Sequence, residues 1–90
     1  MNILDKIVKQ STLKQSTDRI LRFETTLTET NGAMARLHLD PKLRMASITI
    51  QTERFGKWRN HPYDYAKAEA AKMDDLIVWR LRGGCVGGRT

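Results

Sequence analysis

Cations and aromatic rings alternate between Arg54 and Tyr63. This stretch reads RFGKWRNHPY and holds three basic residues and no acid. Arginine and lysine pair with nucleic-acid phosphates, and aromatic rings offer faces on which bases stack. A second acid-free stretch, residues 80–90, holds three more arginines. We therefore predict a nucleic-acid-binding or partner-binding site formed by Arg54, Phe55, Lys57, Trp58, Arg59, His61, Tyr63, Arg80 and Arg82.

Catalytic and metal-binding patterns are not found in the sequence. His38, His61 and Cys85 lack the short, paired spacings of a structural zinc site. Cys85 has no fixed neighbouring base that would activate its thiol as a nucleophile. Asp74 and Asp75 are adjacent in a predicted helix and point in different directions, so they form no carboxylate pair. We expect a protein that is not an enzyme and needs no cofactor or metal.

The composition indicates one small globular domain. The chain has 90 residues, of which 40% are hydrophobic and 29% are charged. This balance is typical of a folded protein with a single core. We expect one compact domain over residues 1–84 and a flexible tail over residues 85–90, because the glycine-rich tail has nothing to bury.

The charge favours an anionic partner. The net charge is +6 and the isoelectric point is near 9.9, which fits nucleic acid or a nucleoprotein complex. The longest apolar run, Leu76–Trp79, is too short to span a membrane, and Asp5 interrupts the region where a signal peptide would be apolar. A single cysteine forms no internal disulfide, which agrees with a reducing compartment. We predict a cytoplasmic protein without a membrane partner.

The period of the apolar residues predicts one helix followed by three strands. A helix is expected from Asn2 to about Gln15, with Asn2 as N-cap and Asp5 in the first turn. From residue 19 the period changes to two, which is typical of half-buried strands. The apolar faces of these strands are Leu21 to Leu27, Ala35 to Leu39 and Ala46 to Ile50.

Two turn sequences fix a register for these strands. Asn31-Gly32 favours a three-residue loop, Thr30–Gly32, with Gly32 in the left-handed conformation. Asp40-Pro41 favours a four-residue loop, Pro41–Arg44. The first loop opposes Leu27 to Ala35, Thr25 to Leu37 and Phe23 to Leu39; the second opposes Leu39 to Ala46, Leu37 to Ile48 and Ala35 to Ile50. Both loops bring the apolar residues to one face.

The other face of the predicted sheet is polar and carries no aromatic ring. This argues against a base-stacking platform on the sheet, as RNA-recognition motifs use, because such platforms need rings on their central strands. His38 is expected opposite both Glu24 and Ser47. We interpret it as a hydrogen-bonded structural histidine.

A second helix is predicted to begin near Pro62, with Asn60 or His61 as its cap, and to end at Gly83-Gly84. Its apolar stripe facing the sheet would be Ala66, Ala70, Met73, Ile77 and Leu81. The alternative breaks the helix at Asp74-Asp75 and makes residues 76–81 a fourth strand, since Ile, Val and Trp prefer sheets.

The predicted fold is α+β in the order α-β-β-β-α: a three-stranded antiparallel meander with both helices packed on its apolar face. This order resembles the double-stranded-RNA-binding domain. The second helix of that family typically starts with lysines and alanines; residues 63–72 supply the alanines without the lysine cluster.

Two classes of function fit these features. The first is a non-enzymatic module that binds DNA or RNA through the loop between the third strand and the last helix. The second is a small inhibitor or adaptor, of the kind that phages and mobile elements encode, that docks on a host protein or nucleoprotein complex through the same Trp, Tyr and Arg side chains. A structural subunit that pairs through a sheet edge is a third possibility. The sequence leaves the oligomeric state open.

Overall fold

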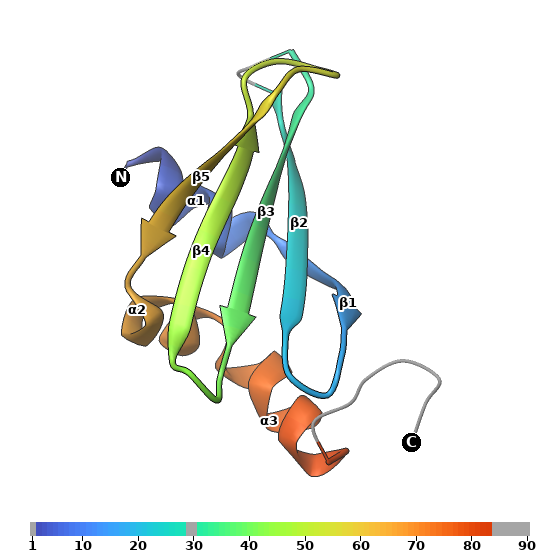
Figure 1. The fold of residues 1–90 in the computed structure, drawn as a ribbon, viewed down its shortest axis with the longest axis vertical. Coiled ribbons are helices and arrows are strands. Elements are labelled where there is room, and N and C mark those ends of the chain that lie inside the picture. Colours follow the sequence, from blue (N-terminus) through green and yellow to red (C-terminus); the bar gives the residue numbers. More distant parts are fainter. Residues whose placement is uncertain (1, 29–30, 84–90) are drawn as a thin grey trace.

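The fold is a five-stranded antiparallel sheet with three helices, seen in a computed structural model that describes residues 2–28 and 31–83. The strands follow one another in chain order across the sheet (Figure 1). The elements are α1 (Ile3–Gln10), β1 (Thr12–Ser16), β2 (Leu21–Leu27), β3 (Ala33–Asp40), β4 (Met45–Gln51), β5 (Trp58–Tyr63), α2 (Tyr65–Ala71) and α3 (Met73–Leu81). The predicted α+β class is confirmed, and the prediction of three strands is wrong by two.

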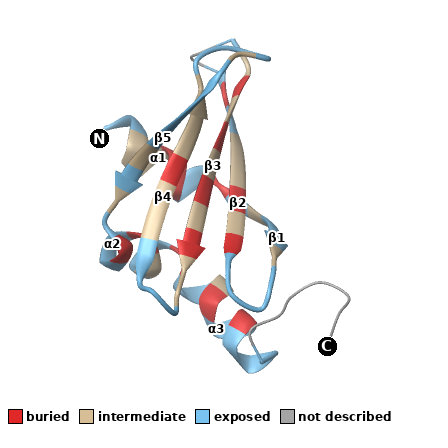
Figure 2. Ribbon diagram, in the orientation of Figure 1, coloured by how far each residue is buried: buried red, intermediate tan, exposed pale blue. Residues whose placement is uncertain are grey.

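All three helices cover one face of the sheet. Helix α1 crosses behind the strands, and α2 and α3 lie at the end where β5 terminates (Figure 1). The strands contribute buried side chains from β2, β3 and β4, and the helices contribute Ile7, Val8, Leu76 and Trp79 to the same core. The buried residues run along the middle of the sheet, while its far tip is exposed (Figure 2). The opposite face of the sheet, here called the open face, carries no helix among the described residues.

The first helix is shorter than predicted, because its last residues form β1. The predicted cap is confirmed: the Asn2 side chain accepts a hydrogen bond of 2.9 Å from the Asp5 N–H. The helix ends at Gln10, and the hydroxyl of Ser11 donates to the Val8 carbonyl at 3.1 Å. The following residues pair with the edge of β2. A short, polar strand of this kind has no strong pattern of its own, and the free edge of β2 supplies its partners.

The two hairpins keep the predicted faces, but only one keeps the predicted register. All three predicted pairs between β3 and β4 are confirmed. Between β2 and β3 the register is shifted by two residues, so that Thr25 opposes Ala35 and Leu27 opposes Ala33. A shift by two leaves every side chain on its face, and alternation alone does not detect it. The observed register also buries Ala33, which is 0% exposed. Gly32 has the predicted positive φ, +82°, whereas Thr30 lies outside the described residues.

Residues 58–63 form a strand, and the prediction that a helix begins near Pro62 is wrong. Strand β5 pairs antiparallel with β4, from Ala46 opposite Tyr63 to Gln51 opposite Trp58. Pro62 is tolerated because β5 is an edge strand. The cap of α2 is Asp64, whose carboxylate accepts a 2.9 Å hydrogen bond from the Ala66 N–H. Neither Asn60 nor His61 caps the helix.

The C-terminal helical segment is broken at Lys72, so both the single long helix and the strand alternative are wrong. Lys72 has φ −114° and ψ 24°, and α3 begins at the next residue. The side chains that face the core are Tyr65, Ala68, Lys72, Leu76 and Trp79. The predicted stripe of Ala66, Ala70, Met73, Ile77 and Leu81 is exposed instead. Because of this break, the side of the helices next to the predicted stripe faces the core.

The resemblance to the double-stranded-RNA-binding domain depended on a predicted order of three strands, and the observed sheet has five. None of the described helices is long and apolar enough to cross a bilayer. The predicted tail, residues 85–90, lies outside the described residues.

Candidate nucleic-acid interface

The β4–β5 loop is a tight turn in which Phe55 adopts the left-handed backbone conformation that glycine tolerates best. The Gly56 N–H donates to the Glu53 carbonyl at 2.7 Å, and the Thr52 N–H donates to the Lys57 carbonyl at 2.8 Å. Phe55, at the third position of this turn, has φ +64°. A turn of this type places glycine or asparagine there, because the left-handed region strains other residues.

Gly56 allows the turn to close. A Cβ atom at this position would lie 2.7 Å from Thr52 Oγ1 and 2.9 Å from the Glu53 carbonyl oxygen. The second of these atoms belongs to the backbone and has little freedom to move. The loop therefore has a fixed shape, and its tip presents one aromatic side chain.

Phe55 is exposed at the tip of the loop. Its side chain is 86% exposed, the highest value among the large hydrophobic residues described. The Arg54 guanidinium lies 5.0 Å from the centroid of its ring. Isolated apolar residues on a surface are common. Phe55 is unusual because exposure and backbone strain coincide, and strain of this kind gathers at ligand-binding sites.

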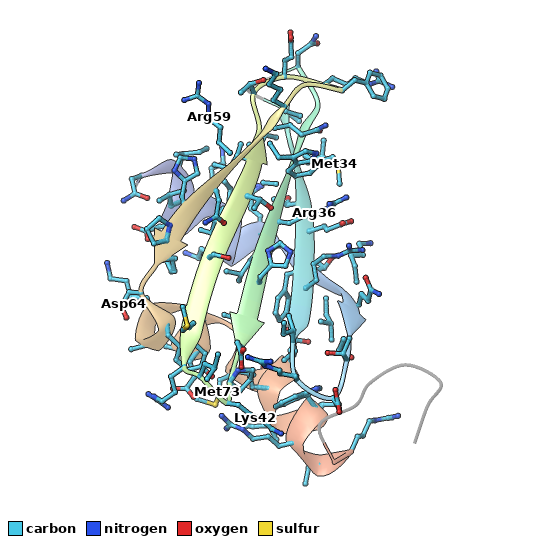
Figure 3. The ribbon with its side chains drawn as sticks, viewed as in Figure 1. Met34, Arg36, Lys42, Arg59, Asp64 and Met73 are labelled. Carbon is cyan, nitrogen blue, oxygen red and sulfur yellow. The ribbon has the colours of Figure 1, made fainter. Side chains whose placement is uncertain are left out.

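Strand β5 separates the predicted site residues onto two faces. Trp58 opposes Gln51 on the open face, whereas Arg59 opposes Ile50 and lies on the helix side. Figure 3 shows Arg59 projecting past the outer edge of the sheet, away from Met34 and Arg36. His61 also lies on the helix side, opposite Ile48. The prediction grouped these residues in one loop, and strand alternation divides them.

Tyr63 lies on the helix side of the sheet, opposite Ala46, and connects β5 to α1. Its hydroxyl donates to Asp5 Oδ1 at 2.6 Å and so joins β5 to α1. Burial and then the Asp5 carboxylate raise the pKa of Tyr63 to about 12. Tyr63 therefore stays neutral and hydrogen-bonded near neutral pH.

Trp58 brings an aromatic ring to the open face, contrary to the prediction that this face has none. The Arg36 guanidinium lies 4.3 Å from the centroid of its ring. Arg36 Nε also donates to Glu24 Oε2 at 2.8 Å, and Arg22 Nε lies 3.6 Å from the same oxygen. This network, which crosses four strands, holds one face of Arg36 against the indole, while the Trp58 side chain remains 39% exposed.

A groove of about 540 Å³ lies between the loop tip and the open face. This volume falls within the roughly 300–1,000 Å³ of small-ligand sites. Arg54 crosses one wall of it, with Cδ 3.9 Å from the place where a Gly32 Cβ would stand. The described residues that line the groove include two arginines and no acid: Thr26, Gly32, Met34, Arg36, Gln51, Arg54, Phe55 and Trp58.

Arg80 and Arg82 do not belong to this groove. They lie on α3, at the opposite end of the molecule from the β4–β5 loop (Figure 1). Arg80 donates to Glu69 Oε2 at 3.2 Å, and Arg82 is the C-cap residue of α3. The predicted site is therefore divided, and Arg54, Phe55 and Trp58 are the members that meet in the groove, with Lys57 in the same loop.

Sequence analysis missed Arg36, Met34 and Gln51 as residues of the groove. All three were correctly assigned to the polar face of the sheet, but no ring was expected beside them. The signal that could have found them is the alternation Trp58, Asn60, Pro62 against Arg59, His61, Tyr63. Pro62 obscured it because proline is also common at a helix start.

His38 occupies a separate part of the open face. It opposes Ser47 as predicted and Arg22 instead of Glu24. Two hollows of about 200 and 250 Å³ flank it. Burial, followed by the charges of Arg22 and Arg36, lowers the pKa of His38, while Glu24 opposes the shift. Neither hollow is lined by a Phe, Tyr or Trp side chain among the described residues, so we place the candidate interface at the groove beside Trp58.

Over the described residues, no three His, Cys, Asp or Glu side chains gather as a metal site. Comparison with protein-family models, curated proteins and solved structures finds no match for this chain.

Proposed function

We propose that this protein is a non-enzymatic module that binds single-stranded or locally unpaired nucleic acid through the β4–β5 loop and the adjoining groove. The observation that carries the proposal is Phe55, an exposed ring held on a strained turn between Arg54 and a groove that contains Trp58. An unpaired base offers a ring face to such side chains, whereas the faces of paired bases are covered by their neighbours in the stack.

The basic residues near the loop have different roles in this proposal. Arg54 and Lys57 are solvent-exposed cations, so they can bind phosphate oxygens. Arg36 is committed to Glu24 and to the indole, and so it orients Trp58. In this proposal the ring of Phe55 stacks on a base, and the exposed part of Trp58 forms the floor on which that base or its sugar rests.

The test is fluorescence-anisotropy titration with single-stranded and duplex DNA and RNA. We expect single strands to bind more tightly than duplexes of the same length. With about two phosphate contacts, affinity should fall roughly tenfold between about 50 and about 200 mM salt. The Arg54→Ala/Lys57→Ala variant should lose most of the binding. A Lys9→Ala/Lys67→Ala variant, which removes the same charge from the exposed helix side, is the matched control and should bind nearly as the parent does.

Tryptophan fluorescence adds a readout that is local to the groove. Trp58 is exposed and Trp79 is 5% exposed, so a stacked base should quench Trp58 selectively. We expect quenching that disappears in Trp58→Phe and persists in Trp79→Phe. Absence of binding at low salt, or equal loss in the matched control, would overturn the proposal.

The alternative is a protein-binding inhibitor or adaptor that uses the same loop. An exposed Phe beside Arg54 and Trp58 favours it, since aromatic residues and arginine are enriched in protein interfaces. Such an interface should respond weakly to salt, in contrast to phosphate contacts. Pairing through a sheet edge is less favoured, because β1 carries a bulge near Lys14 and β5 carries Pro62.

A further inference from the structure

Helix α3 has a second apolar face that no described part of the chain covers. Leu76 and Trp79 face the core and are 0% and 5% exposed. On the other side, Met73, Ile77 and Leu81 follow one another at intervals of four residues and are 39%, 45% and 82% exposed. Val78, beside them, is 47% exposed. Residues four apart lie on one side of a helix, so these side chains form a continuous stripe.

A further exposed apolar residue lies in the β3–β4 loop, at the same end of the molecule as α3. Arg44 in this loop and Arg80 in α3 both approach Glu69, at 3.9 Å and 3.2 Å. Leu43, next to Arg44, is 55% exposed. The loop and α3 lie together at the end of the molecule remote from the β4–β5 loop (Figure 1). A patch of apolar side chains gathered at one end of a small protein is typical of an interaction surface.

The charges along α3 indicate which partner fits the stripe. Asp74 lies in the first turn and Arg82 is the C-cap, and both flank the stripe on the side of Leu81. If a second α3 lies antiparallel, Asp74 of each helix comes beside Arg82 of the other, and Met73 comes beside Leu81. In a parallel arrangement both Asp74 residues would lie at one end of the pair and both Arg82 residues at the other, so no Asp74–Arg82 pair could form between the helices. Antiparallel helices also align their dipoles favourably.

We propose that a second copy of this chain covers the stripe, through an antiparallel α3–α3 pair with a two-fold axis near Ile77. A two-fold axis requires a surface that is complementary to itself, and an apolar centre with opposite charges at its two ends meets this requirement. One pair of short helices forms a small interface, so the dimer should be weak, with Kd on the order of micromolar.

The experiment is sedimentation equilibrium of the full chain over a range of concentrations. We expect a reversible monomer–dimer equilibrium that Ile77→Lys shifts to monomer. Because Ile77 is partly exposed, this variant should keep the parent's circular dichroism. Lys67→Glu, a charge reversal on the exposed side of α2, is the control and should dimerise as the parent does.

Charge exchange tests the antiparallel orientation. Arg82→Glu should weaken the dimer about tenfold, because the carboxylate introduced in each copy would face Asp74 of the other copy. The double variant Asp74→Arg/Arg82→Glu restores opposite charges across the pair and should recover most of the affinity. A chain that is monomeric at all concentrations, or a double variant no better than Arg82→Glu, would overturn the proposal. Neither outcome depends on nucleic-acid binding.

Discussion

Phe55 occupies a backbone conformation that its residue type disfavours, while its side chain contributes little burial. With φ +64° and 86% exposure, it has few contacts that stabilise the fold. A non-glycine residue in the left-handed region costs about 1–2 kcal/mol. Selection for stability alone would favour glycine or asparagine here. An exposed ring at this position is what the proposed stacking on a base would require.

Replacing Phe55 with Asn should separate stability from binding. Asparagine tolerates the left-handed region, so we expect the free energy of unfolding to rise by about 0.5–1 kcal/mol. Loss of the stacking ring should weaken single-strand binding by roughly tenfold. Urea denaturation and anisotropy titration measure the two effects. A large loss of stability would show that Phe55 packs against the fold, and unchanged binding would remove it from the interface.

His38 should make the stability depend on pH under mildly acidic conditions. Burial and the neighbouring arginines lower its pKa below the usual 6.5 in the folded state. Between the two pKa values the unfolded chain binds more protons, so the stability contributed by the neutral imidazole is fully present above about pH 6.5 and falls as pH decreases. His38→Gln should flatten this part of the profile. Thermal denaturation across the range measures it, and an equally steep profile in the variant would assign the effect to other groups.

At the scale of elements, Lys72 connects three parts of the fold. It ends α2, its buried Nζ donates to the Ser11 carbonyl at 2.5 Å, and the same atom lies 5.3 Å from the centroid of the Phe23 ring. Burial lowers the pKa of Lys72, and Asp75 opposes the shift. The lysine thus ties the end of α1 to the break between α2 and α3.

Removing this side chain should destabilise the domain. Lys72→Ala leaves the buried Ser11 carbonyl without its donor and removes a packed aliphatic stem, for an expected loss of about 2–3 kcal/mol in the free energy of unfolding. Lys67→Ala, on the exposed side of α2, should stay within about 0.5 kcal/mol of the parent. Chemical denaturation compares the two. Similar values for both variants would contradict the structural role of Lys72.

At the scale of the whole molecule, the β4–β5 loop and the apolar stripe of α3 lie at opposite ends of a chain whose longest extent is 37 Å. Changes at the two ends should therefore act independently. An α3–α3 dimer would direct its two β4–β5 loops outward, where each could bind its own segment of a strand.

Ile77→Lys should leave the affinity for a short oligonucleotide unchanged, because one loop suffices to bind it. Affinity for a long single strand should fall, since a monomer loses the advantage of two linked sites. Anisotropy titration with oligonucleotides of increasing length compares the variant with the parent. A loss of short-oligonucleotide binding would show that α3 contributes to the nucleic-acid site itself.

The amino-acid sequence determined the central part of the fold. Alternation from Leu21 to Leu27, Ala35 to Leu39 and Ala46 to Ile50 predicted three strands and their buried face, and Asp40-Pro41 set the register of one hairpin. The Asn2 cap was also predicted, because the side chain that caps a helix lies within a few residues of its partner. Such features depend on local geometry and on one apolar face, and both can be derived from neighbouring residues.

The tertiary structure alone decided the edges of the sheet and the composition of the candidate site. Residues 12–16 and 58–63 have weak patterns and become strands because β2 and β4 offer them hydrogen-bonding partners. Because side chains alternate along β5, Trp58 lies beside Arg36 on the open face and Arg59 lies on the helix side. The break at Lys72 similarly selects which side of α3 is buried. These outcomes depend on contacts between residues distant in the chain, which local propensity does not encode.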